Sequence, residues 1–395
     1  MATLANPQDA YPVIHVTGTN GKGSTVRMIE ALLTNMGLRV GTYTSPHLES
    51  INERIAVGGS PISDEDLAAA ITEVAAASEI DDGSRLTWFE TMTAAAFVHL
   101  AGEAVDVAVV EVGMLGRFDA TNVAHAQIAV VTNVGLDHTD GAGDWRSAIA
   151  REKAGIIEPE SILVLGEMNP DLVTDFRQER PRSVLERGLD FDVIDDSLAV
   201  GGRLLEVRTA RAHYSELFVA LHGPHQADNA AIALAATEEF FDSELPADVV
   251  SESFASVAVP ARMEIIGSRP LVMLDVAHNP PGAEALGSAL AGAFGEMKRV
   301  VVLGMLDGRD PRAICEALGV SEAKLVVACS APSRRGLPAE VVAQAVVDTG
   351  GSVEVVAEVD EAIDRAFAVA DPDDMILVVG SHTVVGQARR LLKEN

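Results

Sequence analysis

Lysine is scarce in this sequence of 395 residues, and basic residues as a whole are outnumbered by acidic ones. The chain has 29 Lys and Arg against 59 Asp and Glu, which gives a formal net charge of −30. A surface of this sign repels nucleic acid and anionic membranes, so we expect neither as a partner. It also repels small anions, so a site for an anionic substrate needs local positive charge of its own.

Cysteine and long apolar runs are also rare. Cys315 and Cys329 fall in segments predicted as helix and strand, which is typical of reduced thiols in a core. No basic and apolar leader and no apolar run of membrane-spanning length occurs, so we expect a cytoplasmic protein. Hydrophobic residues nevertheless make up 48% of a chain that is too long for one typical core, which predicts two domains.

Residues 13–25, VIHVTGTNGKGST, form the most informative stretch. A short apolar strand leads into a glycine-rich turn and then into an amphipathic helix. Backbone N–H groups of such a turn converge on a polyphosphate, with Lys22 as a point charge and Ser24 and Thr25 near a metal ion. The stretch therefore predicts a nucleotide site. The alternative is a strand-to-helix glycine turn that binds no ligand.

The remaining pattern predicts an α/β protein of two domains. Buried parallel strands are expected near 38–45, 105–113 and 127–135, with helices at 63–78, 87–101 and 225–241. Residues 48–61 lack a clean period and are predicted as a loop, and 169–221 as antiparallel strands at the edge of the sheet. We expect a phosphate-loop ATPase-type domain with a mostly parallel sheet over 1–267, and a smaller Rossmann-like domain over 268–395.

Hard metal ligands follow several predicted strands of the first domain. Ser24, Ser45, Glu111 and His138 all lie at the end of the sheet where ligands bind in open α/β folds. They suit Mg²⁺, which takes few protein ligands. The alternatives are that Glu111 is a buried acid paired with Arg117, and that His138 is a loop histidine bonded to Asp137 or Asp140.

Four further polar residues attract attention. Asp275 and His278 follow a buried strand of the second domain, and Arg262 stands at the domain junction, where a guanidinium can bind phosphate. Arg262 could equally form an ion pair between domains. Lys153 is predicted on a helix, where a salt bridge to Glu152 or a solvated position is the plain alternative.

The motifs together resemble one family. GTNGKGS, TSPHL, INERI, EVG-x-x-GR-x-DATNV, G-x-DHT, REKAGI, HQADNA, LD-x-AHNP and GS-x-x-x-VG are similar to those of folylpolyglutamate synthase and dihydrofolate synthase, a branch of the Mur ligase superfamily. The resemblance covers nearly the whole chain, in order and at compatible spacing. It implies that 1–267 is the ATP-binding central domain and 268–395 the glutamate-ligase domain.

The resemblance also implies roles for individual residues. Lys22, His138 and Lys153 would be catalytic, and Lys153 matches a lysine that is carbamylated in the family. The implied ATP contacts are Asn20, Gly21, Lys22, Gly23, Ser24, Asn229, Arg262 and Asp275. The implied magnesium ligands, for two ions, are Ser24, Ser45, Glu111 and His138. The implied pterin contacts are Thr87, Phe118, Asp119 and Ala120, and the glutamate contacts are His278 and Ser381.

The implied reaction is formation of an amide at the expense of ATP. The substrates would be ATP, L-glutamate and a reduced folate or dihydropteroate, joined through an acyl phosphate, and we expect a monomer. Two alternatives stay open: a Mur-type ligase that adds an amino acid to another carboxylate, and an ATP-binding regulatory module of the same fold. The short segment before the first strand leaves no room for a nucleotide-sugar domain, which counts against the Mur-type alternative.

The chain departs from the family pattern at three positions that shape the backbone. Leu115, Ala261 and Val276 each stand where glycine is usual in these motifs.

Overall fold

The computed structural model describes residues 1–80, 85–136 and 143–394, and its backbone divides into two compact units. The first unit comprises Met1–His47, Ile51–Ala220 and His225–Ala258, and the second comprises Leu48–Ser50, Leu221–Pro224 and Val259–Asn395. Among the described residues, no helix is both long and apolar enough to cross a membrane. The α/β fold class expected from the sequence is confirmed.

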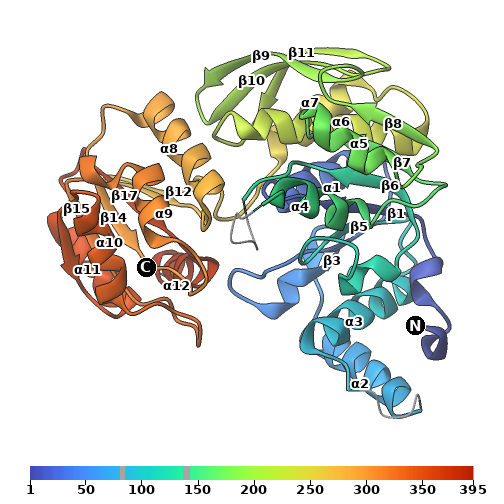
Figure 1. The fold of residues 1–395 in the computed structure, drawn as a ribbon, viewed down its shortest axis with the longest axis horizontal. Coiled ribbons are helices and arrows are strands. Elements are labelled where there is room, and N and C mark those ends of the chain that lie inside the picture. The colour runs from blue at the N-terminus through green and yellow to red at the C-terminus, as the bar shows by residue number, and fades with distance from the viewer. Residues whose placement is uncertain (81–84, 137–142, 395) are drawn as a thin grey trace. The chain divides into compact units, whose positions relative to one another are not determined.

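The first unit is built on an eight-stranded sheet with the order β4-β3-β2-β5-β1-β6-β7-β8 (Figure 1). Strand β1 lies between two parallel neighbours, β5 and β6, and all of its residues are buried. The bounds of the strands are β1 Val13–Thr17, β2 Val40–Tyr43, β3 Ile55–Val57, β4 Ser60–Pro61, β5 Val107–Glu111, β6 Ala126–Val131, β7 Ile162–Leu165 and β8 Ser183–Glu186.

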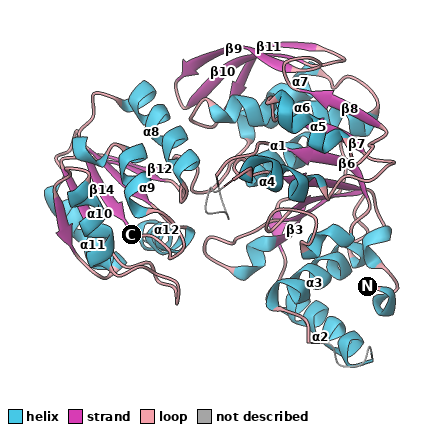
Figure 2. Ribbon diagram, viewed as in Figure 1, coloured by secondary structure: helices cyan, strands magenta, loops and turns pink. Residues whose placement is uncertain are grey.

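Helices cover both faces of this sheet (Figure 2). Helices α1 (Lys22–Asn35), α6 (His225–Phe241) and α7 (Ala247–Ser256) pack together on one face. Helices α2 (Asp64–Ile80), α3 (Trp88–Gly102), α4 (Trp145–Ala154) and α5 (Pro170–Arg177) belong to the other core clusters of the unit. Helix α6 has the bounds expected from the sequence, and α3 begins one residue after its N-cap Thr87, which forms a capping box with Glu90.

Two sequence predictions for this unit were wrong in part. Residues 48–61 were predicted as a loop, but they include a short 3₁₀ helix at Ile51–Arg54 and the antiparallel strands β3 and β4. Residues 169–221 were predicted as edge strands, but they contain α5, the parallel strand β8 and a separate antiparallel sheet. That sheet has the order β11-β10-β9, with bounds Asp192–Ala199, Gly202–Arg208 and His213–Val219 for β9, β10 and β11.

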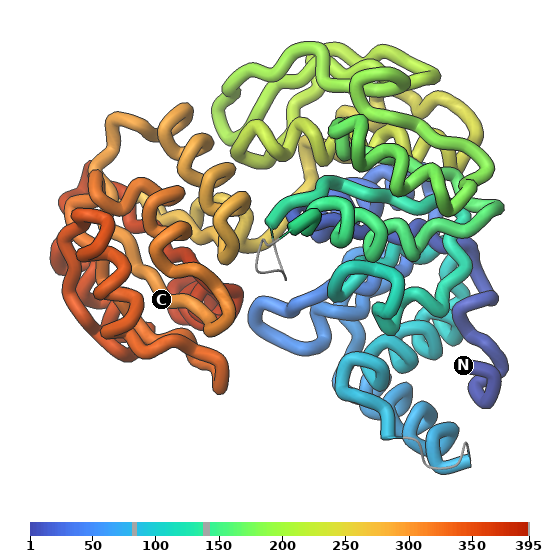
Figure 3. Tube along the Cα trace, in the orientation of Figure 1, coloured from blue at the N-terminus to red at the C-terminus, as the bar shows by residue number. Residues whose placement is uncertain are grey.

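The second unit alternates strands and helices, a path that can be followed in Figure 3. Its six-stranded sheet has the order β12-β13-β17-β14-β15-β16 and is parallel except for β12. Helices α8, α9 and α10 pack on one face, and α11 and α12 on the other. The bounds are β12 Glu264–Ser268, β13 Leu271–Leu274, α8 Pro280–Phe294, β14 Arg299–Leu303, α9 Pro311–Leu318, β15 Leu325–Ala328, α10 Ala339–Asp348, β16 Val353–Val355, α11 Val359–Val369, β17 Met375–Val379 and α12 His382–Glu394.

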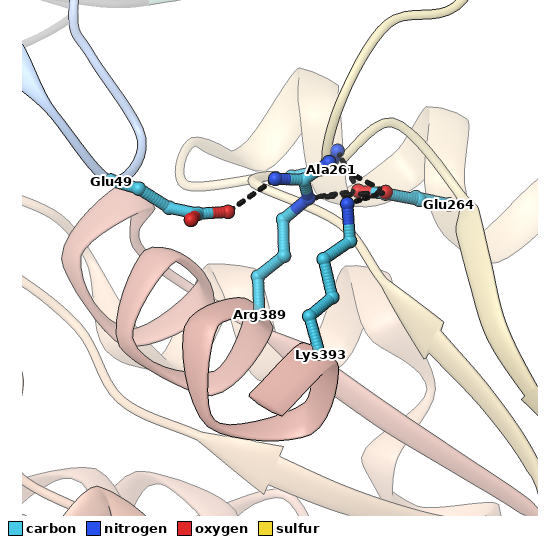
Figure 4. A network of polar contacts seen from close by, with 5 residues as sticks. All are labelled: Glu49, Ala261, Glu264, Arg389 and Lys393. Carbon is cyan, nitrogen blue, oxygen red and sulfur yellow. Dashed lines mark hydrogen bonds and ion pairs between the residues drawn. The ribbon is translucent and has the colours of Figure 1, made fainter. Parts of the chain in front are cut away.

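A network of charged side chains connects three segments of the second unit (Figure 4). Arg389 on α12 forms hydrogen bonds and an ion pair with Glu264, and it also pairs with Glu49. Glu264 accepts a further hydrogen bond of 2.8 Å from the backbone N–H of Ala261, and Lys393 Nζ lies 3.6 Å from it. Through this network the three-residue segment Leu48–Ser50 is held by the last helix.

Candidate active site

The phosphate loop, residues 18–24, joins β1 to α1. Gly18 and Gly21 have φ values of +151° and +85°, which side-chain-bearing residues rarely adopt. A Cβ at Gly18 would lie 1.8 Å from Thr132 Oγ1, and a Cβ at Gly21 would lie 2.4 Å from Asn229 Oδ1. Glycine is therefore needed at both positions for conformation and for space.

The loop is braced by the residues that follow β6. The backbone N–H of Asn20 donates to Asn133 Oδ1 at 3.1 Å, and Asn133 Nδ2 donates back to the carbonyl of Asn20 at 3.0 Å. Thr132 Oγ1 donates to the same carbonyl at 2.6 Å. Sequence reasoning missed this brace. The signal available for it was the polar pair at the carboxyl end of a strand that neighbours β1.

Lys22 is the first residue of α1, where helix N–H groups attract anions. Its Nζ donates to the carbonyl oxygens of Gly18 and Thr19 at 3.0 and 3.3 Å. The ammonium group is thus held above the loop that is expected to hold phosphate.

Glu111 ends β5 beside the start of α1. Its Oε2 accepts a hydrogen bond of 3.0 Å from the backbone N–H of Ser45, and a Cβ at Gly23 would lie 3.7 Å from the same oxygen. Ser24 is buried next to Gly23. Arg117 pairs with Glu179 and not with Glu111, so the structural alternative for Glu111 does not apply.

The fourth expected metal ligand, His138, lies outside the described residues, as do Asp137 and Asp140. Among residues 1–80, 85–136 and 143–394, no three or more His, Cys, Asp or Glu side chains form a cluster able to hold a metal ion. The described donors, Glu111 with the hydroxyls of Ser24 and Ser45, are hard oxygens of the kind that Mg²⁺ prefers. They fit a magnesium ion that takes its other ligands from water and phosphate.

Lys153 is buried on α4, with only 3% of its surface exposed. Within the described part of the chain it has no ion pair with Glu152 or with any other acid, so neither plain alternative for this lysine holds. Burial first, and then the charge of Lys22, lower the pKa of Lys153 well below its usual value. Burial and the neighbouring Lys22 therefore both disfavour the charged form of Lys153.

A pocket of about 520 Å³ opens beside Ser45. Its lining includes all four residues expected to contact pterin, Thr87, Phe118, Asp119 and Ala120. Phe118 is 87% exposed, and the guanidinium of Arg54 lies 4.8 Å from the centre of the Trp88 ring. Arg54 and Trp88 also line the pocket, and sequence reasoning missed both. A lining that combines apolar rings with polar side chains suits a planar heterocycle that carries polar groups.

Among the other expected ATP contacts, Asn229 belongs to the first unit. Its side chain lies against the phosphate loop, because a Cβ at Gly21 would be 2.4 Å from Asn229 Oδ1, and Thr25 Oγ1 on α1 donates to the same oxygen at 3.4 Å. Arg262 and Asp275 belong to the second unit. Asp275 is buried and accepts hydrogen bonds from the backbone N–H groups of Met263 and Ala277 at 2.9 and 2.7 Å. Burial raises the pKa of Asp275, and the charge of Arg262 opposes that rise.

The expected glutamate contacts follow two neighbouring strands of the second unit. His278 comes after β13, and Ser381 comes after β17, which pairs with β13 in parallel. His278 Nδ1 lies 2.8 Å from the carbonyl of Val276, and the buried Ser381 hydroxyl accepts from the N–H of Val384 at 3.3 Å. Arg309 and Arg335 lie in the segments that follow β14 and β15, two parallel strands of this sheet, and so at the same end of it. Burial first, and then the charge of Arg335, lower the pKa of Arg309.

Comparison with known proteins adds independent findings. Residues 16–237 match the Mur ligase middle domain family, and residues 261–382 match the Mur ligase, glutamate ligase domain family. The dihydrofolate synthase/folylpolyglutamate synthase of Mycobacterium tuberculosis is 40% identical over 429 residues, covering 99% of this chain and 88% of that protein.

Two solved structures are similar over nearly the whole chain. Mycobacterium tuberculosis folylpolyglutamate synthase complexed with ADP has a TM-score of 0.95 and 39% identity, and the match covers 100% of this chain and 93% of that one. A bifunctional folylpolyglutamate synthase/dihydrofolate synthase with Mn, AMPPNP and L-glutamate bound has a TM-score of 0.86 and 30% identity, covering 99% and 92%.

Both domain families thus occur in order, and the matched residues include most of the phosphate loop and the strand ends that carry the candidate site. The chain belongs to the Mur ligase family, in its folylpolyglutamate synthase and dihydrofolate synthase branch, and is an ATP-dependent carboxylate–amine ligase.

Proposed function

We propose that this ligase adds L-glutamate to the carboxylate of a reduced folate or of dihydropteroate. The observation that carries the proposal is the position of the pocket, which shares Ser45 with the group around Glu111 and the phosphate loop. An acceptor bound there would place its carboxylate toward the nucleotide. Relatives of this chain are named for both activities, which supports either substrate.

ATP would bind along the phosphate loop, with Asn20 to Ser24 around its phosphates and Asn229 near its base. Arg262 would contact the phosphates and Asp275 the ribose. Each oxygen of Asp275 accepts one backbone hydrogen bond and retains acceptor capacity. We assign ATP binding to residues 1–267 and glutamate ligation to residues 268–395.

The metal would be Mg²⁺, held by Ser24, Ser45, Glu111 and His138, with two ions expected. A related structure carries Mn with AMPPNP, which supports a divalent ion beside the nucleotide. When bound, Mg²⁺ neutralises charge on the phosphates.

Lys153 would act as a carbamate. The neutral form of its amine can attack CO₂ and lose a proton, which converts the buried amine into an anion that suits a metal ion. The lowered pKa, the burial and the lack of an acidic partner among the described residues all favour this chemistry. Mass spectrometry of the native protein in isotopically labelled bicarbonate, compared with Lys153→Arg, tests it.

Glutamate would bind in the second unit near His278 and Ser381. Arg309 and Arg335 lie at the same end of that sheet and supply positive charge in a strongly acidic protein. Guanidinium groups bind carboxylates in a fork geometry, so they suit the two carboxylates of L-glutamate.

The reaction would proceed in two steps. A carboxylate oxygen of the pterin substrate attacks the γ-phosphorus of ATP, and ADP leaves, while Lys22 offsets charge on the transferred group. The amine of glutamate then attacks the acyl carbon, phosphate leaves, and the nitrogen loses its proton. We place these steps in a monomeric, cytoplasmic enzyme.

Mass spectrometry of the products formed from ATP, labelled L-glutamate and each pterin offered separately tests the function. We expect a product that is heavier than the pterin by one glutamate residue. One ADP should be released for each amide bond formed. Lys22→Ala and His138→Ala should each abolish ADP release that depends on both substrates. ADP release with another carboxylate but with no pterin would support the Mur-type alternative, and a lack of substrate-dependent hydrolysis would support a regulatory module.

A further inference from the structure

His15 occupies the middle of β1, a fully buried strand of the first unit. It pairs with Val110 of β5 and Ala129 of β6, and none of its surface is exposed. A polar ring in such a position is unfavourable unless its nitrogens form hydrogen bonds. One nitrogen does, and its partner is hydrogen-bonded in turn to a residue that lines the proposed pterin pocket.

A chain of hydrogen bonds runs from His15 to Asp119. His15 Nε2 lies 2.9 Å from Thr121 Oγ1, and Thr121 Oγ1 donates to Asp119 Oδ1 at 2.5 Å. Because the hydroxyl has a single proton and donates it to the carboxylate, the proton of the first bond must come from Nε2 of His15. The ring is therefore the tautomer protonated at Nε2.

The second nitrogen of His15 is consistent with this tautomer. Nδ1 is buried and has no hydrogen-bond partner among the described residues. Burial lowers the pKa of His15 to about 4, although Asp119 acts to raise it, so the ring stays neutral at neutral pH. Each hydrogen bond of this chain, which we call the relay, is therefore donated outward: His15 donates to Thr121, and Thr121 donates to Asp119.

At its outer end, the Asp119 carboxylate lines the 520 Å³ pocket. Oδ1 also accepts from the N–H of Thr121 at 3.0 Å, and Oδ2 accepts from the N–H of Met114 at 2.8 Å. These bonds hold the carboxylate in one orientation and leave Oδ2 able to accept another hydrogen bond.

We propose that His15 is a positioning residue for substrate recognition: through Thr121 it orients the Asp119 carboxylate to accept N–H donors from the pterin ring. The inference rests on the proposed function, since it needs a pterin in this pocket. Without the Nε2 proton, no hydrogen bond from His15 holds the Thr121 hydroxyl in the orientation that donates to Asp119. The lone pairs of that hydroxyl are then buried without a donor.

Steady-state kinetics of His15→Met and His15→Gln test the proposal, because glutamine keeps an N–H donor and methionine does not. For His15→Met we expect the KM for the pterin substrate to rise about tenfold. We expect the KM for ATP, and kcat, to stay within about twofold of the native values, and His15→Gln to recover most of the loss. A parallel rise of both KM values, or an unchanged pterin KM, overturns the proposal.

Thr121→Val and Thr121→Ser form a second pair that tests the relay if His15→Met does not fold. Valine removes the hydroxyl and should raise the pterin KM, whereas serine keeps it and should not. Combining His15→Met with Thr121→Val should add little to either single change, because both break one relay; fully additive losses contradict it. If the native enzyme shows no pterin-dependent ADP release, the proposed function is wrong. If it shows that release but the variants leave the KM for the pterin unchanged, only the proposed role of His15 is wrong.

Discussion

Leu115 has a left-handed backbone, with φ of +60°, and its carbonyl accepts a hydrogen bond of 2.5 Å from Thr17 Oγ1. This conformation is unfavourable for any residue with a Cβ. We therefore expect Leu115→Gly to be more stable than Leu115→Ala, with a free energy of unfolding about 1 kcal/mol higher. The two variants lose nearly the same side chain, so urea denaturation of the pair isolates the backbone term. Equal stabilities would mean that the backbone relaxes at this residue.

Lys153 makes stability depend on pH. Because its pKa in the folded protein is well below the value of 10.5 expected in the unfolded chain, the unfolded chain binds more protons between those two values. Stability therefore rises with pH across that window. We expect Lys153→Met to be more stable than the native protein by about 1–2 kcal/mol at neutral pH. Its free energy of unfolding should also increase less with pH than that of the native protein.

Urea denaturation at several pH values in CO₂-free buffer provides the measurement for Lys153→Met. The CO₂-free condition matters because a carbamate would replace the amine that titrates. A native protein whose stability does not change between neutral pH and pH 10.5, or a less stable methionine variant, would contradict the prediction.

At the scale of elements, the backbone of Leu48 packs closely on helix α12. A Cβ at Gly386 would lie 1.9 Å from the carbonyl oxygen of Leu48. We expect Gly386→Ala to lower the free energy of unfolding by about 1–3 kcal/mol, because the segment must move. Gly292 in α8 has nothing within 4 Å of its Cβ position, so Gly292→Ala should raise stability by about 0.5–1 kcal/mol. Thermal unfolding of both variants checks the contrast, and a shift of the same sign in both would refute it.

The contacts of Arg389 with Glu264 couple α12 to β12 in a pH-dependent way. Burial alone raises the pKa of Glu264, but the hydrogen bonds from Arg389 and Ala261 outweigh it, and the pKa falls below 4.5. The resulting stability is present above pH 4.5 and is lost as the pH falls through the lowered pKa. We expect Arg389→Met to cost about 1–3 kcal/mol at neutral pH and to unfold in acid at a higher pH than the native protein.

Circular dichroism during acid titration measures that shift for Arg389→Met. Arg312→Met is a matched control, because Arg312 pairs with Glu316 on the exposed face of α9 and should change little. Equal acid midpoints for the two variants would show that the network at Glu264 does not contribute.

Local pattern was enough to predict the elements whose bounds depend on their own residues. Helix α6 has the expected bounds, because it is an alanine-rich run opened by HQADN. Strands β3 and β4 were missed because three residues or fewer form each of them. No period is visible in strands that short.

At the scale of the whole molecule, a net charge of −30 opposes the compact state. We expect added KCl to raise the melting temperature at neutral pH by roughly 3–6 °C between about 0.05 and 0.5 M, because screening weakens the repulsion. The effect should shrink near the sequence pI of about 4.6. A melting temperature that falls with salt at neutral pH would contradict the prediction.

The family motifs predicted part of the candidate site, whereas the contacts that depend on folding could not be predicted from the sequence. Thr87, Phe118, Asp119 and Ala120 were expected from motifs, and they line one pocket. Arg54 and Trp88 were not, because a cation over a ring is created by two segments that meet only in space. The relay from His15 was equally invisible, since a histidine within an apolar strand carries no sign of its partner.

The excursion of Leu48–Ser50 into the second unit has a consequence for dissection of the gene and for synthesis on the ribosome. A fragment that starts at Val259 lacks both the Leu48 backbone beside Gly386 and the Glu49 carboxylate that meets Arg389. During translation, the same three residues emerge early, but they cannot pack on α12 until this last helix has left the exit tunnel.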